Sequence, residues 1–215
     1  MDLDKSMNKH LNRYFDGTRT IPEETIEQLL QFLRSAPTST NIQPSHFIVL
    51  STPEGKAKLA ANLGERFADN GEKITNSSHT IIMTTRADIT PEHLDAVFGK
   101  EREDGRFPTV AKQENWEYMT RDFVNLRTYT HKDTYHWMEK QTYMVMGLLM
   151  MAAAELGVEA MPLEGFDPVT VDEAFDIRTS GYTTTVLLAL GYPDLNKQYT
   201  TAISRFAPDQ LFTFA

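Results

Sequence analysis

Residues 137–156 form the segment that most restricts how this chain can fold. They read as one long helix that is apolar on most of its circumference and ends at Gly157, a residue typical of helix C-termini. Such a helix needs cover on nearly every side, and one small sheet of the same chain cannot supply it. A second copy of the chain can, so the sequence predicts a homodimer.

The longest apolar run in the chain, residues 143–154, is too short for a membrane span, which needs about 20 residues. The first residues, Met1-Asp2-Leu3-Asp4-Lys5, lack the apolar core of a signal peptide. We therefore expect a cytoplasmic protein that does not bind membranes. The methionines of the apolar run are expected to line a buried helix rather than to bind a cofactor; they are Met144, Met146, Met150 and Met151.

The composition argues against several classes of function. A formal net charge of -9 disfavours nucleic-acid binding, which depends on neutralising phosphates with Lys and Arg, although a few local cations can still bind an anionic cofactor. The absence of Cys excludes disulfides, thiolate catalysis and Fe–S clusters. None of the six histidines forms the i, i+4 pair with a carboxylate that is typical of a zinc-binding helix, so no metal is expected.

Length and local patterns predict one domain of the α+β class over residues 1–215, with more helices than strands. Residues 104–108 read as a turn, and residues 193–215 have no clear period. The predicted helices cover residues 22–36, 53–67, 91–98, 110–126, 137–156 and 168–175. The predicted strands cover residues 46–50, 80–85, 158–161 and 182–190, of which the last is apolar enough to be central in a sheet.

A stretch of small polar side chains lies between a predicted helix and a predicted strand. Prolines at both ends stiffen it, so its hydroxyl and amide groups could pair with a planar polar ligand at little cost in entropy. By itself such a cluster is typical of an ordinary loop. The stretch is Ala36-Pro37-Thr38-Ser39-Thr40-Asn41-Ile42-Gln43-Pro44.

This loop resembles the APSSxNxQPW loop of the FMN-dependent NAD(P)H nitroreductase and flavin reductase family, and other stretches agree with that family in order. The likeness extends over essentially the whole chain and is closest to the oxygen-insensitive nitroreductase branch. It implies a nitroreductase-like α+β fold, in which a central, mostly antiparallel sheet is flanked by helices. It also implies an intertwined homodimer with FMN at the interface and the tail wrapped around the partner. The agreeing stretches are Lys9-His10-Leu11-Asn12-Arg13-Tyr14-Phe15, Pro162-Leu163-Glu164-Gly165-Phe166 and Ser204-Arg205.

The resemblance assigns the FMN phosphate to cations near both termini, here Lys9, Arg13 and Arg205. This chain departs from the family pattern, because Lys9 replaces an Arg, Leu11 a Ser or Thr, and Ile203 a Lys. An alignment with gaps would put Arg13 in place of Lys9. From the residues alone, Lys9 and Arg13 read as a solvated helix face.

The resemblance also assigns residues to the flavin ring. Asn70 and Lys73 would face its pyrimidine edge, where a positive charge raises the reduction potential. From the residues alone, Asn70 followed by Gly71 reads as a helix C-cap. The polar loop would reach the ring from the neighbouring subunit through Thr38, Ser39 and Asn41.

The turn that begins with Pro162 and Leu163 would lie beside the flavin. In the family, the backbone N–H at the position of Glu164, followed by Gly165, points at flavin N5, the atom that accepts and returns hydride. The Glu164 side chain then need not act as a general base. Without the family, Glu164 reads as a surface carboxylate.

Phe123 aligns with an aromatic residue that lies over the flavin and contacts substrates, although a lone Phe in a helix is more often part of the core. The polar neighbours Arg121, Asp122 and Asn125 fit a mobile lid. On the opposite wall, Asp69 stands where relatives often carry an aromatic residue, so the pocket is expected to be more open or more polar.

These features predict an FMN-dependent oxidoreductase that passes hydride from NAD(P)H through flavin N5 to nitroaromatic, quinone or flavin acceptors in a ping-pong cycle. No GxGxxG or phosphate-loop motif is present, so NAD(P)H would be a transient co-substrate. Two alternatives stay open: a dihydropteridine or enone reductase of the same fold, and a protein that binds or sequesters FMN without turnover. The choice between NADH and NADPH also stays open.

Overall fold

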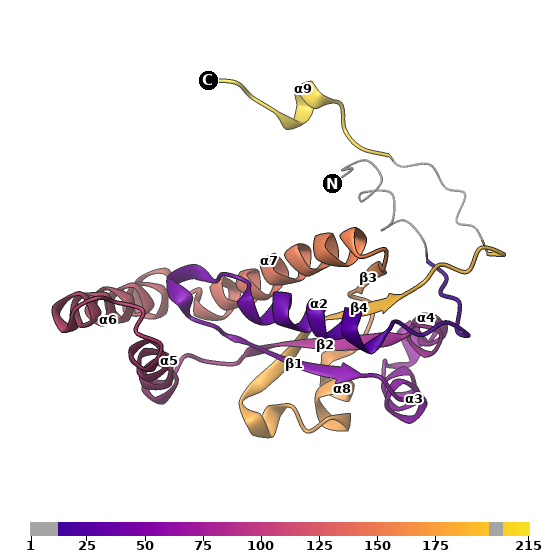
Figure 1. Ribbon diagram of the computed structural model, residues 1–215, viewed down its shortest axis with the longest axis horizontal. Coiled ribbons are helices and arrows are strands. Elements are labelled where there is room, and N and C mark those ends of the chain that lie inside the picture. The colour runs from indigo at the N-terminus through magenta and orange to yellow at the C-terminus, as the bar shows by residue number, and fades with distance from the viewer. Residues whose placement is uncertain (1–12, 198–203) are drawn as a thin grey trace.

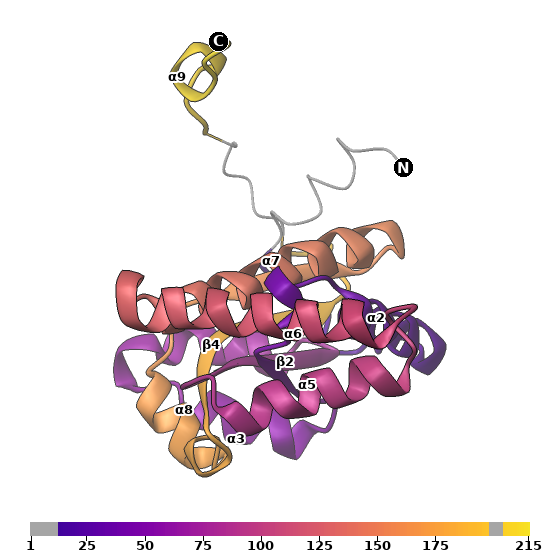
Figure 2. The ribbon, with the colours of Figure 1, turned by 90° about the vertical axis from the view of Figure 1, so that its left-hand side faces the viewer.

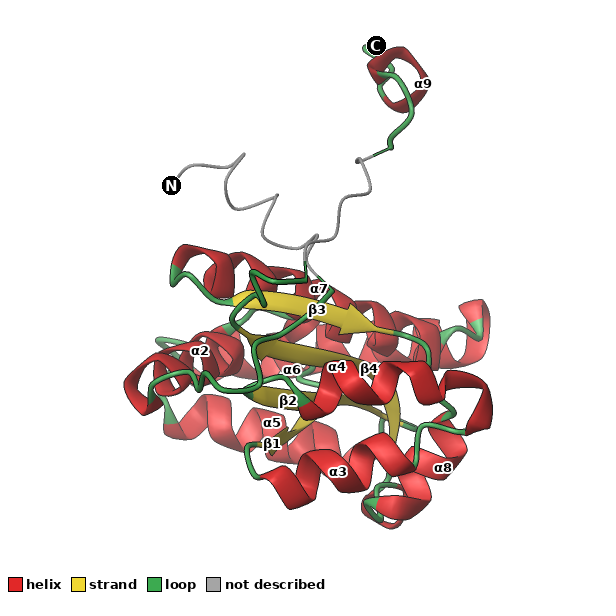
Figure 3. Cartoon of the chain, turned by 90° about the vertical axis from the view of Figure 1, so that its right-hand side faces the viewer, coloured by secondary structure: helices red, strands yellow, loops and turns green. Residues whose placement is uncertain are grey.

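The centre of the protein is a four-stranded antiparallel sheet with the order β1-β2-β4-β3, as Figure 3 shows. The computed structural model describes residues 13–197 and 204–215. The predicted antiparallel sheet and the central position of its last strand are confirmed. The strands are β1 (Ser45–Leu50), β2 (His79–Arg86), β3 (Glu159–Leu163) and β4 (Tyr182–Gly191).

Helices surround this sheet. The α-helices are α2 (Glu23–Ser35), α3 (Pro53–Ala61), α4 (Gly71–Thr75), α5 (Pro91–Glu103), α6 (Val110–Asn125), α7 (Thr134–Glu155), α8 (Pro168–Ala174) and α9 (Pro208–Leu211). Short 3-10 helices occur at η1 (Ser39–Asn41), η2 (Glu65–Asn70) and η4 (Arg178–Ser180), and α6 continues into a π-helix, η3 (Leu126–His131). None of the helices in residues 13–197 and 204–215 is both long and apolar enough to cross a membrane.

Alternation along β4 divides the core into two layers. Val186, Leu188 and Leu190 pack on one face of the sheet with α2 and α7, whereas Leu187 and Ala189 pack on the other face with α3, α4 and α8. Figure 1 shows α2 and α7 on one side of the strands and α3 and α8 on the other. A third cluster joins α5, α6 and the start of α7, which lie one above the other in Figure 2.

Some predicted boundaries were wrong. The helix predicted over 53–67 ends at Ala61, because Gly64 has a φ of 85° and the chain continues as a 3-10 helix. The helix predicted over 91–98 continues to Glu103, with Phe98 and Glu101 buried on one face. The strand predicted over 158–161 extends to Leu163 and includes Pro162, which an edge strand tolerates because one row of its N–H groups has no ladder partner.

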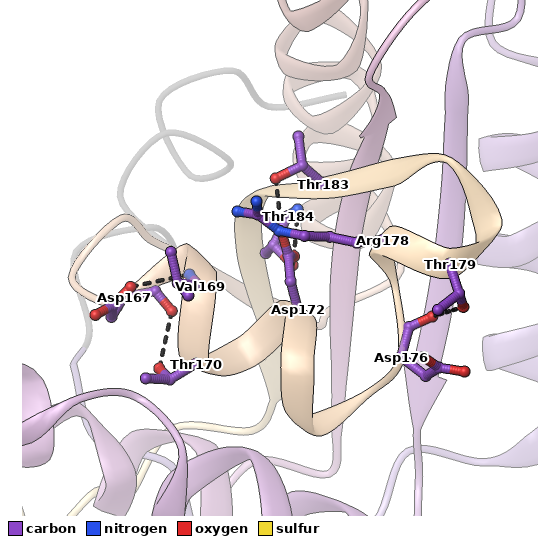
Figure 4. Close-up of polar contacts among 9 residues, drawn as sticks. All are labelled: Asp167, Val169, Thr170, Asp172, Asp176, Arg178, Thr179, Thr183 and Thr184. Atoms are coloured by element: carbon purple, nitrogen blue, oxygen red, sulfur yellow. Dashed lines mark hydrogen bonds and ion pairs between the residues drawn. The ribbon is translucent and has the colours of Figure 1, made fainter.

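Helix α8 is fixed to the start of β4 by the buried carboxylate of Asp172 (Figure 4). This carboxylate accepts hydrogen bonds from the backbone N–H of Thr184 at 2.8 Å and from its hydroxyl at 2.7 Å. Thr183 Oγ1 donates to it at 2.8 Å, and Arg178 Nε at 3.0 Å. Because α8 follows directly after the turn at the end of β3, Asp172 also restrains that turn.

Helix α7 is only partly covered within one chain. Met146 is 8% exposed, but Met144 is 43% exposed and Met150 and Met151 are half-buried, so the methionines that were expected to line a buried helix are not all covered within one protomer. The apolar side chains of the segment 204–215, which lies away from the sheet in Figure 1, are also exposed: Phe206, Leu211, Phe212 and Phe214.

Candidate active site

The turn after β3 is joined to two residues that are distant in the sequence. Asn70 Nδ2 donates a hydrogen bond of 2.8 Å to the carbonyl oxygen of Gly165. Lys73 Nζ, one helical turn later, donates at 2.5 Å to Asn70 Oδ1. Asn70 has helical dihedral angles and Gly71 begins α4, so the C-cap interpretation of Asn70 was wrong. The structure therefore brings together Asn70, Lys73 and the turn, which the sequence had placed in one site.

The close approach of η2 to this turn requires a glycine at position 165. A Cβ atom added to Gly165 would lie 2.5 Å from Asn70 Nδ2 and 3.2 Å from the ring of Phe67. On the far side of the turn, the backbone N–H of Asp167 donates at 2.8 Å to the carbonyl oxygen of Leu63. The turn is thus attached at Gly165 and at Asp167 to the segment that precedes α4.

A hollow of about 540 Å³ lies beside this arrangement, within the size range of small-molecule sites. Two cations that the sequence assigned to a cofactor, Arg13 and Lys73, line it, and so does Asp69. The other residues that line it are Tyr14, Phe15, Ala68, Glu72, Asn76 and Lys197.

Lys197 was not predicted to be part of this site. The segment after β4 runs beside residues 14–16, with the N–H of Asp194 donating at 2.9 Å to the carbonyl oxygen of Tyr14. This pairing brings Lys197 to the hollow, where its Nζ lies 2.7 Å from Glu72 Oε1. No periodicity in the sequence signals this pairing, because it depends on two irregular segments.

Both cations and carboxylates line the hollow, and among them Lys73 favours an anionic or electron-rich ligand. Burial, followed by the neighbouring Arg13, lowers the pKa of Lys73, while Asp69 acts in the opposite direction. The positive charge of Lys73 is therefore only partly compensated by the protein. A bound group that accepts hydrogen bonds or carries negative charge would stabilise the charged form of Lys73.

The polar loop lies at the opposite end of the sheet from α4 (Figure 1). Thr40, Asn41 and Gln43 have φ angles of 50°, 55° and 44°, which are unfavourable for residues other than Gly. Contacts from two helices hold this conformation. Ser39 N donates at 2.9 Å to Gln141 Oε1 of α7, and Asn41 Nδ2 donates at 2.7 Å to Glu101 Oε1 of α5.

Thr38 lines a second hollow, of about 220 Å³, together with side chains of α2, β1 and α7. Within one protomer the structure does not bring Thr38, Ser39 and Asn41 to the hollow that Arg13 and Lys73 line. Glu101 and Gln141, which hold the loop, were missed from the sequence, because Glu101 lies beyond the end of the helix predicted over 91–98 and nothing in the sequence marks Gln141 as a partner of the loop.

The family model described as the nitroreductase family matches residues 8–192. The chain belongs to the nitroreductase family. It is 33% identical over 188 residues to the oxygen-insensitive NAD(P)H nitroreductase of Enterobacter cloacae, covering 87% of this chain and 86% of that protein. It is 25% identical over 198 residues to the major NAD(P)H-flavin oxidoreductase of Aliivibrio fischeri, covering 92% of this chain and 90% of that protein.

A solved nitroreductase-family fold agrees with this membership. A crystal structure from Exiguobacterium sibiricum, in complex with FMN, has a TM-score of 0.80 and 22% identity, and covers 100% of this chain and 98% of that chain. The nitroreductase resemblance and the α+β fold that it implied are thus confirmed.

Besides the polar loop, two more of the predicted residues of this nitroreductase-family chain, Phe123 and Arg205, do not line the hollow. Phe123 packs edge-on against Trp137, with ring centroids 5.4 Å apart, in the cluster between α5, α6 and α7. Arg205 is exposed in the terminal segment, where its Nη1 donates at 2.7 Å to the carbonyl oxygen of Ser204. Lys9 lies outside the described residues, as do the departures at Leu11 and Ile203.

In residues 13–197 and 204–215, the acidic and histidine side chains do not gather into a group of three that could hold a metal ion. The polar side chains that line the hollow are those of Arg13, Lys73, Lys197, Asn76 and Tyr14, together with the carboxylates of Asp69 and Glu72. These groups suit an organic cofactor with anionic and hydrogen-bonding edges.

Proposed function

We propose that this nitroreductase-family protein is an FMN-dependent oxidoreductase that takes hydride from NAD(P)H and passes it to nitroaromatic, quinone or flavin acceptors. The observation that supports this most is the link from Lys73 through Asn70 to the Gly165 carbonyl oxygen beside a cationic hollow. Membership of the nitroreductase family, and the printed names of its relatives, point to the same chemistry.

The residues at the hollow fit FMN. Its volume suits an organic cofactor, and the cationic side chains of Arg13 and Lys73 that line it suit the anionic and electron-rich groups of FMN. Gly165 allows the turn to lie close against Asn70 and Phe67 of η2, since it carries no Cβ. We assign Asn70, Lys73 and residues 162–165 to the ring, and Lys9, Arg13 and Arg205 to the phosphate.

When bound, FMN supplies an atom, N5, that accepts hydride from one substrate and returns it to another. The chain contributes position and charge. Lys73 offsets the negative charge that builds up during reduction, and the backbone N–H of Glu164 is the proposed donor to N5. Phe123 is proposed to border the substrate pocket, which requires α6 to lie over a cofactor that the partner also contacts.

The proposal includes a homodimer of single-domain chains, residues 1–215, with the cofactor between subunits. Two observations support it. The polar loop and the hollow lie at opposite ends of the sheet, so both can contact one cofactor only if they come from different copies. Met144 and the apolar side chains of 204–215 are exposed in the protomer, and a second copy of the chain would bury them. The proposed donor, NAD(P)H, fits the expectation of a cytoplasmic protein.

Steady-state kinetics test the proposed reaction. Purified FMN-loaded protein is assayed with NADH or NADPH against a nitroaromatic, a quinone, free flavin, an enone and a dihydropteridine. A ping-pong cycle gives parallel double-reciprocal lines, with the first three acceptors used best. Fast turnover only with the enone or dihydropteridine would favour a reductase of that kind. Absence of NAD(P)H consumption with every acceptor would favour FMN binding without turnover.

A further inference from the structure

A side-chain contact joins the long helix α7 to the turn after β3. Tyr143 Oη donates a hydrogen bond of 2.8 Å to Glu164 Oε1. The two residues come from different elements, since Tyr143 lies in the middle of α7 and Glu164 directly follows β3. The contact involves the side chain of the residue whose backbone N–H is the proposed donor to the cofactor.

The side chains of Tyr143 and Glu164 differ in how firmly the surrounding structure holds them. The ring of Tyr143 is half-buried and packs against the core cluster between α2, α7 and the sheet, so its position is fixed by that packing. The Glu164 side chain is exposed, and within the described residues the one hydrogen bond to its carboxylate comes from Tyr143. The phenol therefore anchors the carboxylate, rather than the reverse.

The phenol keeps its proton under ordinary conditions. Burial, followed by the hydrogen bond to Glu164, raises the pKa of Tyr143 above its usual value, and Glu139 and Tyr135 act in the same direction. A protonated phenol donates to a carboxylate in a charge-assisted hydrogen bond, which is stronger than one between neutral groups.

The contact completes a three-sided attachment of the turn. Asn70 holds the carbonyl oxygen of Gly165, and Leu63 holds the N–H of Asp167, both from the segment between α3 and α4. Tyr143 holds the same turn from α7. Of these three hydrogen bonds, only the one from Tyr143 holds a charged group of the turn, the Glu164 carboxylate.

We propose that Tyr143 is a positioning residue for hydride transfer, because it holds the Glu164 carboxylate against α7 and away from the reacting ring. The proposal rests on the proposed function. A carboxylate released from Tyr143 could turn toward the side of the turn that faces the cofactor. Negative charge there opposes the arrival of hydride and lowers the reduction potential of the flavin. A free carboxylate at position 164 is therefore worse for the reaction than no carboxylate.

The test is a double-mutant cycle on FMN-loaded protein, with Tyr143→Phe, Glu164→Ala and the double variant. Each protein is measured for its FMN dissociation constant, its flavin midpoint potential and its single-turnover rate of anaerobic reduction by NADPH or NADH. Tyr118→Phe, which removes a phenol hydroxyl from a 68% exposed residue of α6, is the matched control.

We expect Tyr143→Phe to lower the midpoint potential and to slow reduction by about tenfold, with FMN affinity changed by less than about threefold. Glu164→Ala keeps most of the rate. Adding Glu164→Ala to Tyr143→Phe restores the rate and the potential to those of Glu164→Ala alone. This rescue would not occur if Tyr143 served only to pack the core.

If the wild-type protein is reduced normally and Tyr143→Phe has the same reduction rate and midpoint potential, the inference is overturned. The proposed function would stay intact. Equal losses from Tyr143→Phe in the presence and absence of Glu164 would also overturn the inference, because the effect would then not pass through the carboxylate. A wild-type protein that binds FMN but is not reduced would overturn both.

Discussion

Asn70 Nδ2 lies 2.8 Å from the carbonyl oxygen of Gly165, although the two residues are 95 positions apart in the chain. This hydrogen bond connects the segment before α4 to the turn after β3. It gives the proposed FMN site a fixed geometry on one protomer, because Lys73 donates to the same Asn70 side chain.

Replacing Gly165 by Ala should disrupt this contact. The new Cβ would lie 2.5 Å from Asn70 Nδ2, so Asn70 or the turn must move. Overpacking of this kind costs about 1–3 kcal/mol, and we expect both a lower melting temperature and FMN affinity reduced by about tenfold or more. Thermal unfolding and FMN titration measure these effects.

The matched control for that substitution is Gly99→Ala on α5. Nothing lies within 4 Å of the position that its Cβ would occupy. Alanine in a helix interior is more favourable than glycine by roughly 0.5–1 kcal/mol, so Gly99→Ala should be neutral or stabilising and leave FMN affinity unchanged. Equal behaviour of the two variants would show that Gly165 is not needed for the close approach.

Two substitutions of Glu164 separate its backbone from its side chain. Glu164→Ala keeps the N–H and should retain substantial reduction by NAD(P)H, whereas Glu164→Pro removes the donor and should slow reduction by on the order of tenfold or more. Single-turnover reduction under anaerobic conditions measures the rate, and FMN content and melting temperature are checked in both. Loss of reduction in Glu164→Ala with FMN still bound would make the carboxylate itself catalytic.

The buried carboxylate of Asp172 should matter for stability. Asp172→Ala would leave the donors on Arg178, Thr183 and Thr184 without their acceptor, at a cost of about 3–5 kcal/mol. Asp95→Ala removes an exposed ion pair with Arg121 and should cost less than about 1 kcal/mol. Denaturant unfolding compares the two. Similar costs would mean that the Asp172 network does not hold α8 to β4.

Two histidines should make the protein less stable in mild acid. Burial is the main cause that lowers the pKa of both His93 and His79, with Arg86 and Lys56 respectively adding to it. The folded state then binds fewer protons than the unfolded state. Their contribution to stability is therefore complete above the unfolded value of about 6.5 and is lost progressively as the pH falls below it.

Unfolding free energies measured between pH 7.5 and 5 check this dependence on pH, with the double variant His79→Gln/His93→Gln as the comparison. We expect the fall in stability below about pH 6.5 to be smaller in the variant than in the wild type. An identical slope in both proteins would assign the acid sensitivity to other groups.

The sequence predicted the strands and the family well, because runs such as residues 80–85 are β-branched and apolar and the motifs are local. It predicted the composition of the site less well. From neighbouring residues alone, Asn70 reads as a helix cap, and only the fold shows that its side chain reaches Gly165.

The contacts that hold the site were not predictable for a physical reason. Glu101 and Asn41 are 60 residues apart, and Tyr143 and Glu164 are 21 apart on different elements. When they are read in isolation, Glu101 and Glu164 fit solvated positions, Asn41 fits an ordinary loop, and Tyr143 belongs to an apolar run. Their partners depend on how α5 and α7 pack, which periodicity does not specify.

The visible absorbance spectrum of the purified FMN-loaded protein, recorded before and after anaerobic addition of NADPH or NADH, tests the proposed function most directly. The account predicts one FMN per chain and loss of the oxidised flavin band within seconds, followed by its return when a nitroaromatic or quinone is added. A protein that takes up no FMN, or whose bound FMN keeps its oxidised spectrum with both nucleotides, would contradict the account.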